Sequence, residues 1–231
     1  MKVEVDISAL ASLSREVQIT PDVIFSPRWK RRSHLAIKRL IDLTVSTTLL
    51  TLLSPVFVVL SIAVKMSSPG TIFYRWRVVG QSGRAFVGYK FRSMVSNADE
   101  LKDKLTDLNE MTGPMFKITH DPRVTKVGHW MRRYSLDELP QFYSVLTGEM
   151  SLVGPRPPLV TEYAQFNDFQ KQKLSVKPGI TCLWQVNGRN SVSDFDDWVK
   201  LDLEYIREWS LWLDLKILLR TIVTVFSGSG K

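Results

Sequence analysis

Two neighbouring carboxylates, Asp137 and Glu138, stand in the stretch SLDELPQ shortly after the arginines Arg132 and Arg133. Adjacent acids can share one reaction, because one carboxylate can attack an electrophile while the other binds a metal ion. Their basic neighbours favour a phosphorylated substrate, since the planar guanidinium of arginine donates two parallel hydrogen bonds to a phosphate. The stretch therefore indicates phosphate chemistry, with a magnesium ion to complete the site.

The same stretch also has a purely structural interpretation as a capping box. In that case Ser135 caps a helix and Glu138 returns a hydrogen bond to the backbone. Pro140 argues against it, because a proline at the fifth helical position removes a backbone hydrogen bond and clashes with the preceding turn. If the segment is instead a turn before a helix, the two carboxylates point in different directions and can take different tasks. Both interpretations stay open from the sequence.

Further basic residues stand in segments that are rich in glycine and proline. Arg156 lies between Pro155 and Pro157, which fix the backbone on either side and leave little entropy to lose on binding. Arg189 lies in the predicted turn NGRN. Each is by itself more often a surface charge than a ligand, but together they favour a phosphate site. The candidate substrate-binding residues are Lys90, Arg92, Arg132, Arg156 and Arg189.

The composition favours anionic partners without choosing among them. The 231 residues include 31 Lys and Arg against 23 Asp and Glu, a net charge of +8, which suits nucleic acid, anionic lipid or phosphorylated small molecules. The sequence contains no nucleic-acid-binding motif, so we expect no nucleic-acid partner. The single cysteine, Cys182, excludes an intrachain disulfide, and the histidines lack the spacing of a zinc site.

An apolar run covers residues 40–64, LIDLTVSTTLLTLLSPVFVVLSIAV, which is long enough to cross a bilayer. Pro55 predicts a kink near its middle, and basic residues flank both ends, although positive charge marks the cytoplasmic side. We therefore expect a helix that enters the bilayer, breaks at Ser54-Pro55 and returns to the same side, with the Ser54 hydroxyl bonded to a carbonyl freed by the proline. The alternative is an ordinary kinked transmembrane helix with a translocated catalytic domain.

The other elements predict a mixed fold. The segments TIFYRWRVV and RAFVGYKFRSM indicate a β-hairpin, and Asn97 is expected to cap an amphipathic helix over ADELKDKLTDLNE. The C-terminal WSLWLDLKILLRTIVTVF predicts an amphipathic helix that lies in the membrane interface or packs on the core.

The expected fold class is α+β and mostly helical, with interfacial helices around a cytoplasmic catalytic core. The predicted divisions are a mobile N-terminal arm over residues 1–33, a re-entrant membrane helix over 34–66 and the catalytic domain over 67–231.

A series of short motifs resembles the bacterial sugar transferase family, which consists of monotopic polyprenyl-phosphate glycosylphosphotransferases. The resemblance runs from about Lys38 to the C-terminus. The motifs are LLSP, SPGTIFYR, KFRSM, GPMFK, DPRVT, RRYSLDELPQ, GEMSLVGPRP, KPGIT, WQVNGRN and LDLKILLRT.

This resemblance implies an activity and assigns roles. Members transfer a sugar-1-phosphate from a UDP-sugar to undecaprenyl phosphate and release UMP, at the start of exopolysaccharide, capsule or O-antigen assembly. Asp137 is then the nucleophile, which forms a phosphosugar-aspartyl intermediate, and Glu138 is the ligand of Mg²⁺, the expected cofactor. Arg132 and Arg189 match positions that hold phosphate or nucleotide. Pro155-Arg156-Pro157 matches a signature beside the site, and Ser54-Pro55 matches the break of the re-entrant helix.

The resemblance also implies a bilayer as partner and a location on the cytoplasmic face of the bacterial plasma membrane, and the apolar faces leave room for a homodimer. Cys182 and Trp76 depart from the family pattern, which often has glycine and glutamine there. Larger relatives carry additional N-terminal membrane helices. This sequence shows no such helices, so we expect it to resemble the short, catalytic-core form. A catalytically idle membrane scaffold for glycan-assembly enzymes is the alternative function.

Overall fold

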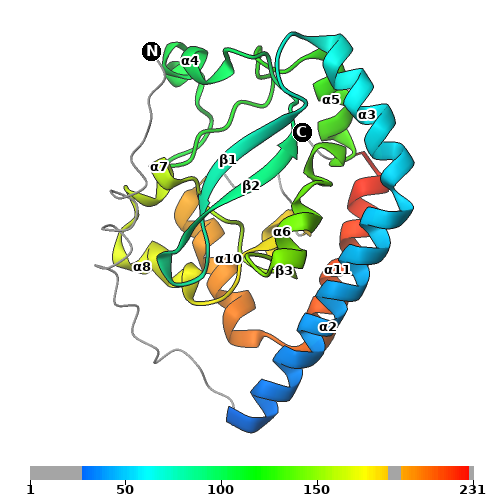
Figure 1. Ribbon diagram of the computed structural model, residues 1–231. Coiled ribbons are helices and arrows are strands. Elements are labelled where there is room, and N and C mark those ends of the chain that lie inside the picture. Colours follow the sequence, from blue (N-terminus) through cyan, green and yellow to red (C-terminus); the bar gives the residue numbers. More distant parts are fainter. Residues whose placement is uncertain (1–27, 187–193, 229–231) are drawn as a thin grey trace.

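The computed structural model describes residues 28–186 and 194–228 (Figure 1). The described chain is mostly helical and contains two small sheets, which confirms the prediction of an α+β fold. Helix α2 begins at Arg28, before the predicted domain boundary at residue 34. Most of the predicted N-terminal arm, residues 1–27, lies outside the described residues.

A bent pair of helices runs along one side of the molecule (Figure 1). Helices α2 (Arg28–Leu52) and α3 (Ser54–Ser67) meet at a bend of 62°. The cause is local: Pro55 has no N–H, so the carbonyl of Thr51 loses its helical donor. The hydroxyl of Ser54 donates to that carbonyl instead, over 2.8 Å. The predicted break and its serine cap are therefore confirmed.

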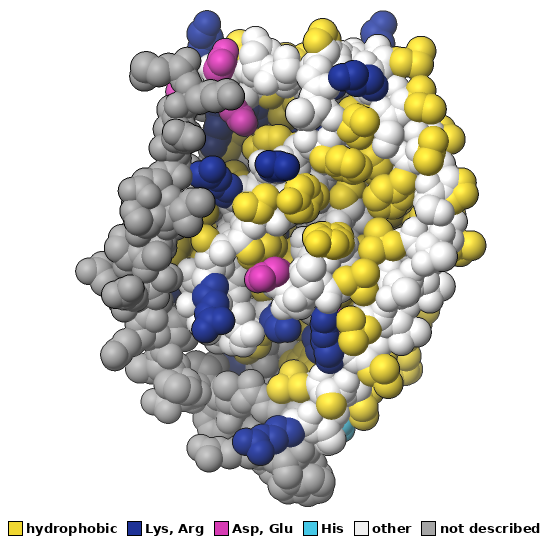
Figure 2. Space-filling model, viewed as in Figure 1, with side chains coloured by type: hydrophobic (Ala, Val, Ile, Leu, Met, Phe, Trp, Pro, Cys, Tyr) yellow, Lys and Arg dark blue, Asp and Glu magenta, His cyan; other side chains and the backbone are white. Residues whose placement is uncertain are grey.

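The length and composition of this pair match those of a membrane segment only when the two helices are taken together. Among the described residues, no single helix is long and apolar enough to cross a bilayer, whereas the bent pair meets both criteria. Its outer surface is rich in exposed apolar side chains, and Figure 2 shows hydrophobic residues gathered along the edge that α2 and α3 form in Figure 1. The exposed ones include Leu40, Leu52, Val58, Val59, Ile62 and Met66.

The predicted hairpin is confirmed. Strands β1 (Phe73–Val79) and β2 (Ala85–Phe91) pair antiparallel across the 3₁₀ turn η1 (Gln81–Gly83). A second sheet pairs β3 (Ser151–Val153) in parallel with β4 (Gly179–Thr181).

The backbones of the second sheet approach each other closely just past β3. A Cβ atom at Gly179 would stand 2.1 Å from the backbone nitrogen of Gly154. This approach demands glycine, and it sets the position of the Pro155-Arg156-Pro157 segment that follows.

The prediction of one helix over the whole of ADELKDKLTDLNE is wrong, because the helix is shorter. Regular helix ends after α4 (Ala98–Lys102), and a 3₁₀ segment, η2 (Asp103–Leu108), follows. The side chain of Asn97 makes no capping bond, and Leu108 is exposed. A short helix with so little apolar burial is marginal, which explains why the heptad-like leucines do not sustain it. The other helices are α5 (Lys126–Arg133), η3 (Leu136–Glu138), α6 (Gln141–Thr147), α7 (Val160–Tyr163), α8 (Asp168–Lys171), η4 (Gln172–Ser175), α9 (Leu183–Val186), α10 (Phe195–Glu208) and α11 (Leu211–Phe226).

Helix α11 does pack on the core, but its polar side contributes to the buried surface. Asp214 and Ile217 are buried, while Trp212, Leu219 and Phe226 are exposed, the last by 81%. A helix in a soluble protein normally turns its apolar stripe inward. The apolar outer face of α11 therefore continues the surface of α2 and α3.

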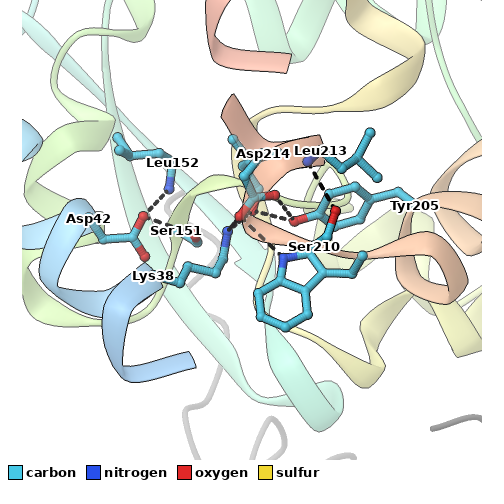
Figure 3. A network of polar contacts seen from close by, with 10 residues as sticks. Lys38, Asp42, Ser151, Leu152, Tyr205, Ser210, Leu213 and Asp214 are labelled. Atoms are coloured by element: carbon cyan, nitrogen blue, oxygen red, sulfur yellow. Dashed lines mark hydrogen bonds and ion pairs between the residues drawn. The ribbon is translucent and has the colours of Figure 1, made fainter. Parts of the chain in front are cut away.

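A buried ion pair joins α2 to α11 (Figure 3). The Lys38 ammonium lies 2.6 Å from Oδ2 of Asp214 and donates to the carbonyl of Val153 at the end of β3. The hydroxyl of Tyr205 donates to Oδ1 of Asp214 over 2.8 Å. Burial, together with the Asp214 charge, raises the pKa of Tyr205, so this hydroxyl remains a donor. One turn along α2, Asp42 accepts hydrogen bonds from Ser151 Oγ and Leu152 N.

We expect Asp214→Asn to destabilise the protein, because it leaves the Lys38 ammonium buried without its counter-charge. Removal of one partner of a buried pair costs about 3 kcal/mol, so the midpoint of thermal unfolding in detergent should fall by several degrees. The matched control is Asp197→Asn, which breaks the exposed pair with Lys200 and should leave the midpoint nearly unchanged. Equal midpoints for the two variants would contradict the assigned role of the buried pair.

Candidate functional site

The acid pair lies in a tight connection between two helices. Helix α5 ends at Arg133, Ser135 adopts a left-handed backbone with φ of 54°, and the 3₁₀ turn η3 then carries both acids. Pro140 stands at the N-cap position of α6, where its missing N–H costs no helical bond. Ser135 makes no side-chain cap. The capping-box interpretation is therefore wrong, and the turn before a helix is confirmed.

A left-handed backbone at a residue other than glycine costs about 1–2 kcal/mol. Such strain persists only where the surroundings hold it in place, and it is typical of functional sites. Here it reverses the chain between α5 and α6 within a few residues, and it brings Asp137 beneath the basic end of α5. The Asp137 side chain is thereby largely withdrawn from solvent, with 8% of the residue exposed.

Glu138 forms an ion pair with Lys90 from strand β2, with 2.8 Å between Nζ and Oε1. The two side chains are only 14% and 13% exposed. Burial lowers the pKa of Lys90, while the neighbouring carboxylates of Glu138 and Asp137 oppose that effect. The charges of this site are therefore strongly coupled, because little water screens them.

Trp76 supports the ammonium of Lys90 from below. Nζ lies 4.1 Å from the indole centroid, within the range of a cation–π contact. Trp76 pairs with Gly88 across the hairpin, and a Cβ at Gly88 would stand 2.2 Å from the indole nitrogen. Glycine at position 88 thus makes room for the indole of Trp76. This departure from the family pattern therefore lies against Lys90, beside the acid pair.

Arg132 is the second basic neighbour of the acids. Its Nε donates to the hydroxyl of Ser93 over 2.9 Å. Burial lowers its pKa, and the charges of Asp137 and Asp121 oppose the change. Of the carboxylates that act on Arg132, Asp137 has the strongest effect, so the structure brings these two residues together as the sequence predicted.

Arg156 is the third basic neighbour, and it is presented by a rigid segment. Pro155 and Pro157 are buried, and Gly179 N donates to the carbonyl of Pro155 over 2.9 Å. The positive charge of Arg156 also contributes to the lowered pKa of Lys90. Its Nε is buried and has no hydrogen-bond partner within the described part of the chain. An unsatisfied buried guanidinium N–H suits an anionic ligand.

Arg92, another predicted substrate ligand, is occupied elsewhere. Its guanidinium donates to the carbonyls of Ser68 and Pro69, just past the end of α3. A cation at that position satisfies carbonyls that have no helical partner. The side chain therefore holds the end of α3 against the hairpin, and a direct contact with substrate stays a prediction. Arg189 lies outside the described residues.

Several supporting residues were missed in the sequence. Ser93, which lies just past β2, accepts a hydrogen bond from Arg132. The position of Trp76 beneath Lys90 depends on the strand register, which period-two alternation alone does not provide. A buried pair, Lys173 and Asp202 at 2.6 Å, also lies beyond any local motif. Cys182 is buried nearby, and burial raises the pKa of its thiol.

The acid pair is suitable for a hard cation. Carboxylate oxygens are the ligands that Mg²⁺ prefers, and it takes one or two of them together with substrate phosphates and water. No group of three or more His, Cys, Asp or Glu side chains able to hold a metal occurs among the described residues. A magnesium ion at Glu138 would therefore depend on the phosphates of the substrate for further ligands.

The sequence is similar to several known proteins. Galactosyl transferase CpsE of Streptococcus agalactiae serotype III (strain NEM316) is 49% identical over 208 residues, which make up 90% of this chain and 46% of CpsE. UDP-glucose:undecaprenyl-phosphate glucose-1-phosphate transferase of Escherichia coli (strain K12) is 44% identical over 200 residues, which make up 83% of this chain and 40% of that relative. The chain thus spans less than half the length of either protein.

A shorter relative matches over most of both chains. The exopolysaccharide production protein ExoY of Rhizobium meliloti (strain 1021) is 39% identical over 197 residues, or 84% of this chain and 87% of ExoY. A family profile described as bacterial sugar transferase matches residues 33–228, a range that contains every residue of the site described above. The resemblance inferred from the motifs is therefore confirmed, and this chain belongs to the bacterial sugar transferase family.

Proposed function

We propose that this protein transfers a sugar-1-phosphate from a UDP-sugar to undecaprenyl phosphate and releases UMP, as the first membrane step in the assembly of an exopolysaccharide or related glycan. The observation that carries the proposal is the acid pair itself: Asp137 and Glu138 are held side by side among Lys90, Arg132 and Arg156. The names of several relatives give the same reaction class, with undecaprenyl phosphate as acceptor.

The proposed chemistry has two displacements at one phosphorus. A carboxylate oxygen of Asp137 attacks the sugar-linked phosphorus of the donor, and the bond to the bridging oxygen breaks, so UMP leaves with that electron pair. An oxygen of the lipid phosphate then attacks the same phosphorus and releases the Asp137 carboxylate. Arginine and lysine favour both steps, since they neutralise the charge on the phosphoryl oxygens. Mg²⁺, bound through Glu138, would supply further charge neutralisation at the diphosphate.

The basic residues of the site suit the diphosphate of the UDP-sugar. The buried Nε of Arg156 has no described partner, and the neighbouring Lys90 is an ammonium in a weakly screened environment. We propose that these groups bind the diphosphate of the UDP-sugar, while Glu138 exchanges part of its contact with Lys90 for the metal. The buried lysine then has two roles: it pairs with Glu138 in the absence of substrate, and it offers its charge to phosphate when the metal is bound.

The outer apolar surfaces of α2, α3 and α11 provide the contact with the bilayer. We propose that the bent pair enters the cytoplasmic leaflet of the bacterial plasma membrane and returns, so the catalytic residues face the cytoplasm. Burial of exposed apolar area in lipid contributes roughly 25 cal/mol per Å². The basic residues in the first turns of α2 and those that follow α3 remain at the anionic surface on one side.

Asp137→Asn should abolish turnover, because an amide is not a competent nucleophile toward phosphorus. The sharpest measurement is covalent labelling with UDP-sugar that carries radioactivity in the sugar, with no lipid acceptor added. The parent protein should become labelled, the variant should not, and Asp107→Asn on the exposed surface should behave like the parent. Normal labelling of Asp137→Asn would exclude the assigned nucleophile, and a parent chain that never releases UMP would favour the idle scaffold.

Removal of divalent metal should stop UMP release, and added Mg²⁺ should restore it. Glu138→Gln should raise the Mg²⁺ concentration needed for half-maximal rate by at least about tenfold, because it removes one charged ligand. Glu149→Gln, at an exposed position outside the site, is the matched control. Full activity in excess chelator would contradict the assigned role of the metal.

Topology can be tested with single cysteines. In intact cells, Lys2→Cys and Lys231→Cys should both be protected from a membrane-impermeant maleimide, and both should react after permeabilisation. The parent chain is the control, because its only cysteine, Cys182, is buried. Pro55→Ala restores a donor for the Thr51 carbonyl, so it should straighten the pair and expose the C-terminal cysteine in part of the molecules. If only one of the two cysteines reacts from outside in the protein that keeps Pro55, the result would instead support a helix that simply crosses the membrane.

A further inference from the structure

A pocket of about 530 Å³ opens beside the acid pair but does not include it. It lies between helix α5, the loop over residues 118–124 and Gly228, which follows α11. Its size exceeds what a lone phosphate needs and fits a phosphate with part of an attached chain. The lining residues are Ile118, Thr119, His120, Asp121, Val124, His129, Trp130, Arg132, Arg133 and Gly228.

The charge of this pocket is positive. Arg132 and Arg133 both line it, and neither forms one of the salt bridges found among the described residues. Asp121 is the acidic residue in the lining, but Arg123 neutralises it, with 2.6 Å between NH2 and Oδ2. His120 and His129 add ring nitrogens at the rim. Such a set of donors recognises phosphate.

The wall of the pocket is held in place without a ligand. Glu110 accepts hydrogen bonds from both the backbone nitrogen and the hydroxyl of Thr119. Arg123 donates to both carboxylate oxygens of Asp121 and also to the carbonyl of Ala98. A wall that is already ordered loses little entropy on binding, which favours a built site over a chance depression.

The pocket also has an apolar side and lies beside the apolar surface of the molecule. Ile118, Val124 and Trp130 contribute hydrophobic lining, and Trp130 is 52% exposed. Helix α5 packs against α3, and Gly228 lies two residues past Phe226, the exposed last residue of α11. Exposed tryptophan is typical of a membrane–water interface. The occupant therefore combines phosphate with an apolar chain.

Arg132 connects this pocket to the reaction centre. It lines the pocket, and Asp137 is the carboxylate that acts on it most strongly. Helix α5, which carries Arg132, also packs against η3, which carries Asp137, so a phosphate bound here would lie on the opposite side of α5 residues that adjoin the acid pair. By contrast, Lys90 and Arg156, which we assign to the donor diphosphate, do not line the pocket.

We propose that this pocket receives the phosphate group of the lipid acceptor, with Arg133 and His129 as its distinguishing ligands. The inference rests on the proposed function and divides its binding site in two: the donor diphosphate binds at Lys90 and Arg156, and the lipid phosphate enters between α5 and the end of α11. Arg132 is shared, so the acceptor can advance toward Asp137 once UMP has left.

The two half-reactions allow a direct test on the full chain in nanodiscs. The variant is His129→Gln with Arg133→Gln, and Lys126→Gln, which removes a charge from the same helix outside the pocket, is the matched control. Exchange of labelled UMP into UDP-sugar, without any lipid acceptor, should stay within about twofold of the parent. The KM for undecaprenyl phosphate at saturating donor should rise about tenfold, as expected for lost charge-assisted hydrogen bonds.

Each other outcome overturns the inference. An unchanged KM for the lipid acceptor would show that the pocket does not bind it, and a raised KM for the UDP-sugar would assign the pocket to the donor. The parent and the variant are also compared in nanodiscs of phosphatidylglycerol and of phosphatidylcholine. If the acceptor KM is unchanged and the variant only loses the dependence of its rate on this choice of lipid, the occupant is a bulk phospholipid head group. His129→Gln alone, on an exposed side chain, repeats the test if the double variant fails to fold. Absence of exchange in the parent protein would instead contradict the proposed function.

Discussion

The position of the site relative to the apolar surface depends on the buried pair between Lys38 and Asp214. The ammonium of Lys38 also donates to the carbonyl of Val153, and the chain continues from there directly into Pro155-Arg156-Pro157. Asp42 accepts bonds from the same strand, so the inner side of α2 is fastened to β3 at two levels. Close charge pairs with satisfied partners tolerate little displacement, since an unpaired charge in this environment is costly. The polar inner face of α2 thereby fixes Arg156 relative to the exposed apolar surface.

The reaction site is a second place where charges are buried together. Lys90, Glu138, Asp137 and Arg132 come from a strand, a 3₁₀ turn and the end of a helix, and their electrostatic coupling is strong because water is largely excluded. If the proposed diphosphate substrate binds in such a site, it would exchange partners with groups that are already oriented, so little reorganisation would accompany the reaction. The left-handed backbone of Ser135 and the prolines beside Arg156 contribute to this orientation. Each of them fixes the backbone next to a side chain of the candidate site.

Local chemistry explains what the sequence could predict. The break at Pro55 and the bond from Ser54 follow from the missing N–H of the proline, and Pro140 argued against the capping box for the same reason. The hairpin was accessible through its turn residues, and the motif around Asp137 and Glu138 was visible in the sequence, although the roles assigned to these two acids stay proposals. Pairs of residues that are distant in the sequence could not be predicted. Lys38 pairs with Asp214, which is far away in the sequence, and Lys90 pairs with Glu138 only because the fold brings the two together. Arg92 illustrates the difference, since it stands two residues from Lys90 yet bonds to the end of α3.

The helical wheel of α11 shows why periodicity alone could not decide its orientation. Its pattern has one apolar and one polar side, and the usual rule turns the apolar side inward. In the structure the buried part of the helix combines Ile217 with Asp214, whose charge is met by Lys38. The outer part carries Trp212, Leu219 and Phe226 together with the exposed Lys216 and Arg220. Such an arrangement is unfavourable in water, because it exposes apolar area and buries charge, and it becomes favourable where the outside is lipid. The same reversal holds along α2, where Asp42 is buried and Leu40 is exposed, so both helices argue for one continuous surface against the membrane.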